Sequence, residues 1–261
     1  MPYMRFAFLA ITSIMLLAGC KRQPANINLE QAHSKTSANI IAPGFGTIGI
    51  IKDHEIFVYF LDRNSTWTLD NVSQFQIPEN SDGVLSLGMG VMGVLQNNTM
   101  HFYYIDAQNN WSKYRDVTFE TPENFKRITS MRLPWEIGFI ATENRKGIIS
   151  FYYLDENKKW VSDETANFGI PPDTDDYIMM GGMEIGIIKD NKLGVYQLDD
   201  FGRWQFMDDL VLSLPNSFEA VLSYEPGTIA VLKQGRMMFH RLDITNRKWV
   251  YDPSMDFQLP V

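Results

Sequence analysis

The chain of 261 residues has little cysteine or histidine, and its apolar runs are short after the N-terminus. The single cysteine, Cys20, cannot form a disulfide within the chain. The four histidines show no spacing typical of a metal site; they are His33, His54, His101 and His240. No later stretch reaches the roughly 18 apolar residues of a spanning helix. Nucleophile-elbow and phosphate-loop motifs are also missing, so we expect no enzyme activity, no cofactor and no metal.

Basic residues are outnumbered as well. The chain has 23 Lys and Arg against 31 Asp and Glu, which gives a formal net charge of −8. An acidic surface repels the phosphate backbone of nucleic acids and anionic lipid headgroups. We therefore expect no nucleic-acid partner, and any membrane attachment has to come from something other than surface charge.

The first 20 residues supply such an attachment. Arg5 precedes an apolar run over residues 6–17, and Leu17-Ala18-Gly19-Cys20 follows. A charged start, a short apolar segment and small residues predict a signal peptide over residues 1–19. The ending resembles the lipobox of bacterial lipoproteins. That resemblance implies cleavage before Cys20, acylation of Cys20 (palmitate) and anchoring in the cell envelope. Lys21, in place of the Asp of inner-membrane retention, implies the outer membrane, facing the periplasm.

Residues 20–37 are polar and show little periodicity, which predicts a flexible tether that begins at the lipidated cysteine. An ordinary free cysteine after a plain signal peptide is the alternative.

Residues 38–261 repeat one pattern five times. Each unit contains a Gly, a polar turn, a strand-like run that ends in Asp, a short turn, a Trp, and finally a Pro. The recurring residues are Asp62, Asp106, Asp155, Asp199 and Asp243; Trp67, Trp111, Trp160, Trp204 and Trp249; and Pro78, Pro122, Pro171, Pro215 and Pro260. The interval from Trp to Pro is 11 residues in every unit.

A period of about 44 residues with strand-like content is typical of propeller blades. We predict an all-β, five-bladed β-propeller with four antiparallel strands per blade. The predicted blades span residues 38–80, 81–124, 125–173, 174–217 and 218–261. The repeat frame leaves no blade divided between the termini, so the ring should close by side-chain packing of blade 1 on blade 5.

The third strand of each unit has large side chains at successive positions, such as Phe102 and Tyr103, so both faces of each sheet should be covered by neighbouring blades. The first strands have mainly small residues in register, which should line a narrow central channel. These residues are Ala42, Ser86, Ser130, Met179 and Ser223.

The recurring Trp and Asp residues have two interpretations each. A Trp could stack on a sugar, but the structural interpretation places it between blades with its indole N–H on a backbone carbonyl. An Asp at the start of a turn caps backbone N–H groups. We favour the structural interpretation for both.

The third unit breaks the pattern. It runs 17 residues from Gly138 to Asp155, where the other units run 13, and we place the extra residues near residues 142–146, between the second and third strands. The following link is acidic. Loops on a rigid scaffold often bind partners, so the candidate binding residues are Asn144, Arg145, Lys146, Asp173, Asp175 and Asp176, with Trp135 as a contact on the opposite face. The acidic link lacks the Gly and distal Glu of a calcium loop. A surface insertion without function is the alternative.

These features favour a lipid-anchored binding or scaffold propeller that docks another protein, for example as an immunity or inhibitor lipoprotein. One alternative is a lectin-like binder of cell-envelope glycans. Another is a five-bladed glycosidase, which would have to use acids at the strand ends such as Asp82 and Asp176.

Overall fold

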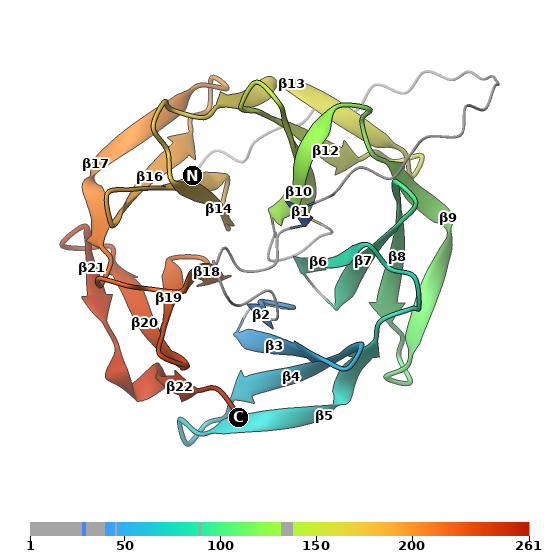
Figure 1. Ribbon diagram of the computed structural model, residues 1–261, viewed down its shortest axis with the longest axis horizontal. Helices are drawn as coiled ribbons and strands as arrows, with labels where there is room; N and C mark the ends of the chain where they lie inside the picture. The colour runs from blue at the N-terminus through green and yellow to red at the C-terminus, as the bar shows by residue number, and fades with distance from the viewer. Residues whose placement is uncertain (1–27, 30–39, 45, 89, 132–137, 261) are drawn as a thin grey trace.

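The computed structural model describes residues 28–29, 40–44, 46–88, 90–131 and 138–260. Five antiparallel sheets stand radially around a central axis (Figure 1). In each sheet the first strand is innermost and the fourth lies at the rim. The fold is therefore the predicted five-bladed β-propeller with four strands per blade.

The four strands of each blade are consecutive in the chain. The strands of blades 1 to 3 are β2 (Ile40–Ile41), β3 (Thr47–Lys52), β4 (Glu55–Leu61) and β5 (Trp67–Gln76); β6 (Gly83–Gly88), β7 (Val91–Gln96), β8 (Thr99–Ile105) and β9 (Trp111–Glu120); and β10 (Phe125–Met131), β11 (Phe139–Asn144), β12 (Ile148–Leu154) and β13 (Trp160–Gly169).

Blades 4 and 5 follow the same order. Their strands are β14 (Asp176–Met180), β15 (Glu184–Lys189), β16 (Lys192–Leu198) and β17 (Trp204–Ser213); and β18 (Ala220–Glu225), β19 (Thr228–Lys233), β20 (Arg236–Asp243) and β21 (Lys248–Tyr251). A short 3-10 helix, η1 (Pro253–Met255), leads to β22 (Phe257–Gln258), which pairs with β20. One further strand, β1 (Asn28–Leu29), pairs in parallel with β10.

The turns between second and third strands are tight. In blade 2, Asn97 and Asn98 both have positive φ, as a two-residue hairpin turn requires. The link that leaves each blade bonds back to this turn; for example, the Thr121 N–H donates to the Asn98 carbonyl (3.0 Å). The second-to-third turns and the links therefore share one face of the ring, which we name the link face. The other two turns of each blade lie on the opposite face.

Apolar packing holds the ring together. The buried residues form five clusters, and each cluster combines side chains from two neighbouring blades. On β8, for instance, Phe102 packs toward blade 3 and Tyr103 toward blade 1. The two-sided pattern of the sequence is confirmed, and no blade covers its own faces.

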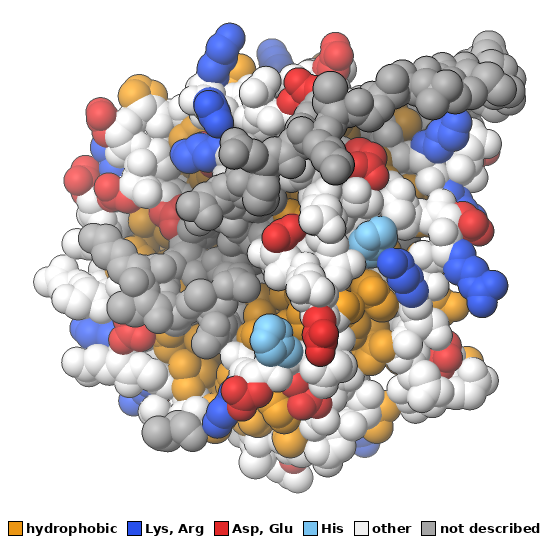
Figure 2. All heavy atoms as spheres, turned by 45° about the vertical axis from the view of Figure 1, so that its right-hand side comes forward, with side chains coloured by type: hydrophobic (Ala, Val, Ile, Leu, Met, Phe, Trp, Pro, Cys, Tyr) orange, Lys and Arg blue, Asp and Glu red, His pale blue; other side chains and the backbone are white. Residues whose placement is uncertain are grey.

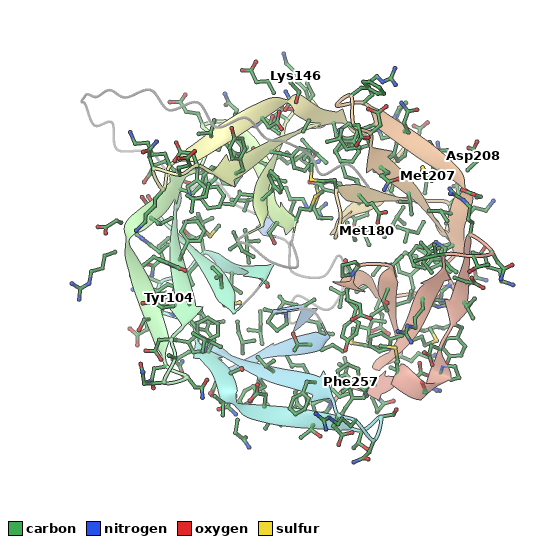
Figure 3. All side chains as sticks on the ribbon, turned by 180° about the vertical axis from the view of Figure 1, so that it is seen from behind. Tyr104, Lys146, Met180, Met207, Asp208 and Phe257 are labelled. Atoms are coloured by element: carbon green, nitrogen blue, oxygen red, sulfur yellow. The ribbon has the colours of Figure 1, made fainter. Side chains whose placement is uncertain are left out.

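Ring closure occurs through side chains, as predicted. Trp67 of blade 1 stacks on Phe239 of blade 5 (5.6 Å between ring centroids) and contacts Phe257 (4.9 Å). Phe257 lies where the first and last blades meet (Figure 3). Among the described residues, the sheets of blades 1 and 5 share no strand.

The other repeated tryptophans pack in the same way, against the blade that precedes them. Three indole N–H groups donate to backbone carbonyls of that blade: Trp67 to Met255 (2.8 Å), Trp204 to Ala166 (2.9 Å) and Trp249 to Leu210 (3.2 Å). The indole nitrogens of Trp111 and Trp160 are buried without a partner. The structural interpretation of the tryptophans is confirmed, but the predicted hydrogen bond forms in three of the five.

The repeated aspartates cap the turns that precede the fourth strands. Asp106 Oδ1 accepts the N–H groups of Gln108 and Asn110, both at 2.9 Å. Asp62, Asp155 and Asp199 accept the same pair of N–H groups in their own turns, and Asp243 accepts the N–H of Asn246 (3.0 Å). Each carboxylate thus stabilises its turn.

The central channel is narrow. Its lining includes the five predicted residues Ala42, Ser86, Ser130, Met179 and Ser223. The hydroxyl of Ser130 donates to the Ser86 carbonyl, and that of Ser86 to the Pro43 carbonyl, so these serines join neighbouring first strands. A space of about 50 Å³ is open between these residues.

Candidate functional site

The insertion in blade 3 lies mainly in a different loop from the predicted one. Partners between the first and second strands are eight residues apart in four blades, as in Leu85 and Gly93, but Thr129 and Ala141 of blade 3 are twelve apart. Four extra residues therefore precede β11. One further extra residue lies in the turn from β11 to β12. Ala141 and its partner Phe151 are ten residues apart, whereas Gly93 and Phe102 of blade 2 are nine apart.

The error comes from aligning Gly138 with the repeated Gly. The repeated position is occupied by Gly49, Gly93 and Gly186, where an added Cβ would come within 2.7–2.9 Å of a neighbouring side chain. In blades 3 and 5 the same position is Ala141 and Ala230. Since two of the five blades have Ala at this position, Gly138 is not the equivalent of the repeated Gly, and an alignment on Gly displaces the third unit.

The predicted loops nevertheless meet. The Ile170 N–H donates to the Gly147 carbonyl (2.8 Å), which joins the second-to-third turn of blade 3 to the link that follows. Between them is a hollow of about 290 Å³ on the link face. It is lined by Lys126, Arg127, Glu143, Arg145, Gly147, Ile170, Pro171, Asp173, Thr174, Asp175, Asp176 and Tyr177.

A charged network joins blades 3 and 4 among these residues. Arg127, which is 6% exposed, donates from Nη1 to Asp176 Oδ1 (3.0 Å) and from Nη2 to the Tyr177 carbonyl (2.9 Å). Its guanidinium also covers the Tyr177 ring, at 3.8 Å from the centroid. Glu143, 3% exposed, accepts from Lys126 Nζ (2.7 Å) and from the Tyr177 hydroxyl (3.2 Å).

This network uses one of the predicted binding residues, because Asp176 belongs to the contact between the blades. Its pairing with a buried arginine contributes to stability, since removing one member of a buried ion pair leaves an uncompensated charge. Arg127 Nε is buried without a hydrogen-bond partner, so the guanidinium keeps one unused donor.

Two more predicted residues act on the backbone. Asn144 Oδ1 accepts the N–H groups of Lys146 (2.9 Å) and Ile148 (3.1 Å) and so caps the turn. Asp175 Oδ2 accepts the Asp190 N–H (2.9 Å). Asp82 caps the equivalent turn of blade 2 through the Asn97 N–H (2.9 Å). These contacts are structural, although Asp175 remains exposed.

The remaining predicted residues form an exposed rim. Arg145 and Lys146 are exposed, and neither side chain forms an ion pair with a described residue. Asp173 is 86% exposed at its side chain and lies 3.8 Å from Lys189 Nζ. Lys146 projects at the outer edge of the ring (Figure 3). The hollow thus has cations on the blade 3 side and carboxylates on the link side. Cys20 and Trp135 lie outside the described residues.

Sequence reasoning missed Arg127, Glu143 and Tyr177. A signal was present, because the strand register makes Arg127 of blade 3 and Asp176 of blade 4 equivalent positions. Opposite charges at equivalent positions of adjacent blades indicate a contact between those blades. The signal is present in the sequence, because Ser130 and Met179, which the repeat places in register, are three residues after Arg127 and Asp176.

The carboxylates proposed for a glycosidase do not meet in the described structure. A glycosidase needs two carboxyl groups about 5–9.5 Å apart at one bond. Asp82 caps a turn of blade 2, and Asp176 is paired with Arg127 of blade 3. Burial raises the pKa of Glu184 to about 7, but Glu184 begins β15, at the other end of blade 4 from Asp176.

Among the described residues, no group of three or more His, Cys, Asp or Glu side chains is arranged to hold a metal ion. The same part of the chain contains no helix long and apolar enough to cross a membrane. Figure 2 shows acidic and basic side chains mixed over the visible surface rather than gathered by sign.

Comparisons with known proteins return only distant likenesses. No protein-family model and no curated protein matches the chain. A protein of unknown function from Desulfotomaculum acetoxidans is similar at a TM-score of 0.43 and 8% identity, over 87% of this chain and 69% of the other. Kluyveromyces lactis Hsv2 is similar at 0.41 and 10%, over 83% and 84%. Neither likeness bears on function.

Proposed function

We propose that this chain is a lipid-anchored propeller of the bacterial cell envelope that docks another protein through the hollow between blades 3 and 4. The observation that carries the proposal is the rim of that hollow. Arg145 and Asp173 line it, and Lys146 is exposed next to Arg145. The network between the blades holds this scaffold. An immunity or inhibitor lipoprotein is one form of this function.

The chemistry of the rim suits a polypeptide. Charges of both signs at fixed positions select a partner with the complementary arrangement and suppress wrong partners. A segment that enters the hollow would meet Arg145 on one side and Asp173 on the other. A hollow of about 290 Å³ admits a few side chains of such a segment.

The same observations disfavour the lectin alternative. Sugars bind to exposed aromatic faces, but the Tyr177 ring is covered by Arg127. The repeated tryptophans are occupied between blades, as with Trp160 on Phe102 and Trp204 on Phe151. A set of exposed aromatic and polar residues recurring in several blades would be needed for a multivalent glycan binder.

Anchoring at Cys20 rests on the lipobox-like sequence. Each buried methylene of an acyl chain contributes about 0.8 kcal/mol, and more than one chain gives stable attachment. The anchor would place the propeller at a membrane surface without any spanning segment. Lys21 favours the outer membrane.

Substitutions at the rim test the docking proposal. We expect the triple variant Arg145→Ala, Lys146→Ala, Asp173→Asn to lose capture of the partner from solubilised envelope, because it removes the charges of the rim. Asn is chosen since residue 173 has a φ of 61°, which Asn tolerates. The free energy of unfolding should change by about 0.5 kcal/mol or less, as for other surface changes. Capture is measured by mass spectrometry with residues 21–261 as bait.

A matched triple variant serves as control. Arg63→Ala, Lys159→Ala, Asp200→Asn removes the same charges from exposed positions on the opposite face. Unchanged capture by the control together with loss by the rim variant supports docking at the hollow. If the rim variant captures the partner as well as the control variant and the unsubstituted chain do, the binding surface lies elsewhere.

A further inference from the structure

The N-terminal strand β1 fixes where the anchor segment meets the propeller. Asn28 pairs with Arg127 and Leu29 with Ile128, on the inner edge of blade 3 (Figure 1). In the other four sheets the innermost strand, β2, β6, β14 or β18, has no further strand beside it among the described residues. The segment therefore adds to one blade of the five and gives the tether a defined attachment point.

The direction of β1 determines the face at which the anchor segment leaves the ring. Strand β10 begins directly after the link that joins blades 2 and 3, and it ends toward the opposite face. Because β1 is parallel to β10, Asn28 is the end of β1 nearer the link face. Arg127, which pairs with Asn28, also lines the hollow. The start of β1 and the hollow thus lie toward one face.

The attachment shortens the reach of the anchor. From Cys20 to Ile40 there are twenty residues, which span up to about 72 Å at about 3.6 Å per residue and would let the ring take any orientation. From Cys20 to Asn28 there are eight, which span at most about 29 Å. A blade strand of seven residues is itself about 23 Å tall, so the opposite face cannot approach the anchor as closely as the link face does.

We infer that the acylated protein sits with its link face, including the hollow, toward the lipid bilayer and its opposite face away from it. The inference rests on the proposed acylation of Cys20. It specifies the partner further, since Asn28, which pairs with Arg127 at the hollow, lies within about 29 Å of the acylated residue. That location suits the membrane-proximal part of an envelope protein.

Energy transfer from the protein to lipid tests this orientation. The acylated full chain is purified from membranes with a donor dye on a single introduced cysteine, since an acylated Cys20 has no free thiol. Asn124→Cys labels the link between blades 2 and 3, and Gln108→Cys labels the opposite face of blade 2; both positions are exposed. The vesicles contain phosphatidylethanolamine, phosphatidylglycerol and an acceptor-labelled lipid. We expect at least twofold higher transfer from residue 124 than from residue 108.

Two further variants separate the possible failures. Cys20→Ser should remove vesicle binding; if the unsubstituted chain also fails to bind, the anchor is wrong and the orientation falls with it. Bound protein with equal or reversed transfer overturns the orientation but leaves the anchor standing. Asn28→Pro with Leu29→Pro removes the backbone donors of β1 and should abolish the contrast while vesicle binding persists. An unchanged contrast in this double variant overturns the role of β1.

Discussion

Removal of blade 5, by ending the chain after residue 217, should abolish cooperative folding. The four remaining blades would expose the apolar face of blade 4 around Leu193 and Val195, and the face of blade 1 around Trp67. Two large apolar sheet faces cannot be covered by the rest of an open ring. We expect aggregation or a product without a cooperative thermal transition, measured by circular dichroism and size-exclusion chromatography.

The control removes residues from the other end of the chain. A protein that starts at Gln23 keeps all five blades and β1, and it should melt as the unshortened chain from Lys21 does. A soluble, monomeric four-blade fragment with a sharp melting transition would contradict the claim that every blade depends on both neighbours.

Trp67→Ala should lower the free energy of unfolding by about 3–5 kcal/mol, which is the range for a large aromatic truncated inside a core. The indole stacks on Phe239, contacts Phe257 and donates to the Met255 carbonyl, and all three belong to blade 5. Truncation therefore weakens the one interface that closes the ring. Urea unfolding followed by fluorescence of the remaining tryptophans measures the change.

Val72→Ala is the matched control for this variant. Val72 lies on the same strand, β5, and is 51% exposed. Its truncation should change stability by about 0.5 kcal/mol or less. A Trp67→Ala cost near that of Val72→Ala would show that the contact between blades 1 and 5 contributes little to closure.

Trp67→Phe and Trp160→Phe separate the contribution of the indole hydrogen bond from that of packing. Trp67→Phe loses ring area and a hydrogen bond, whereas Trp160→Phe loses ring area alone, because only Trp67 has an acceptor for its indole N–H.

The blades could be predicted because their spacing is set by backbone geometry. A turn that begins with Asp106 and a strand that begins with Trp111 recur at fixed intervals, since each copy must present the same faces to its neighbours. The same regularity gave the blade order, the closure by side chains and the small residues of the channel. Repeated features of this kind can be recognised in a single sequence because each copy shows the same residues at the same spacing.

The candidate site was harder to predict because it depends on departures from the repeat. Ala141 replaces the repeated Gly in blade 3, and this substitution moved the insertion to the wrong loop. The pairing of Arg127 with Asp176 joins residues 49 positions apart and occurs between one pair of blades, so the repeat does not single it out. The pairing of β1 with β10 has no counterpart in the repeat. Contacts that occur once leave no period in the sequence.

The central claim is that a partner docks at the hollow, and site-specific photo-crosslinking in cells that produce the protein tests it most directly. A photoreactive amino acid replaces Lys146 at the rim, or Lys159 on the opposite face as control; both side chains are exposed. Our account predicts one discrete crosslinked protein from position 146 and none from position 159. No product from position 146, or the same product from both positions, would contradict it.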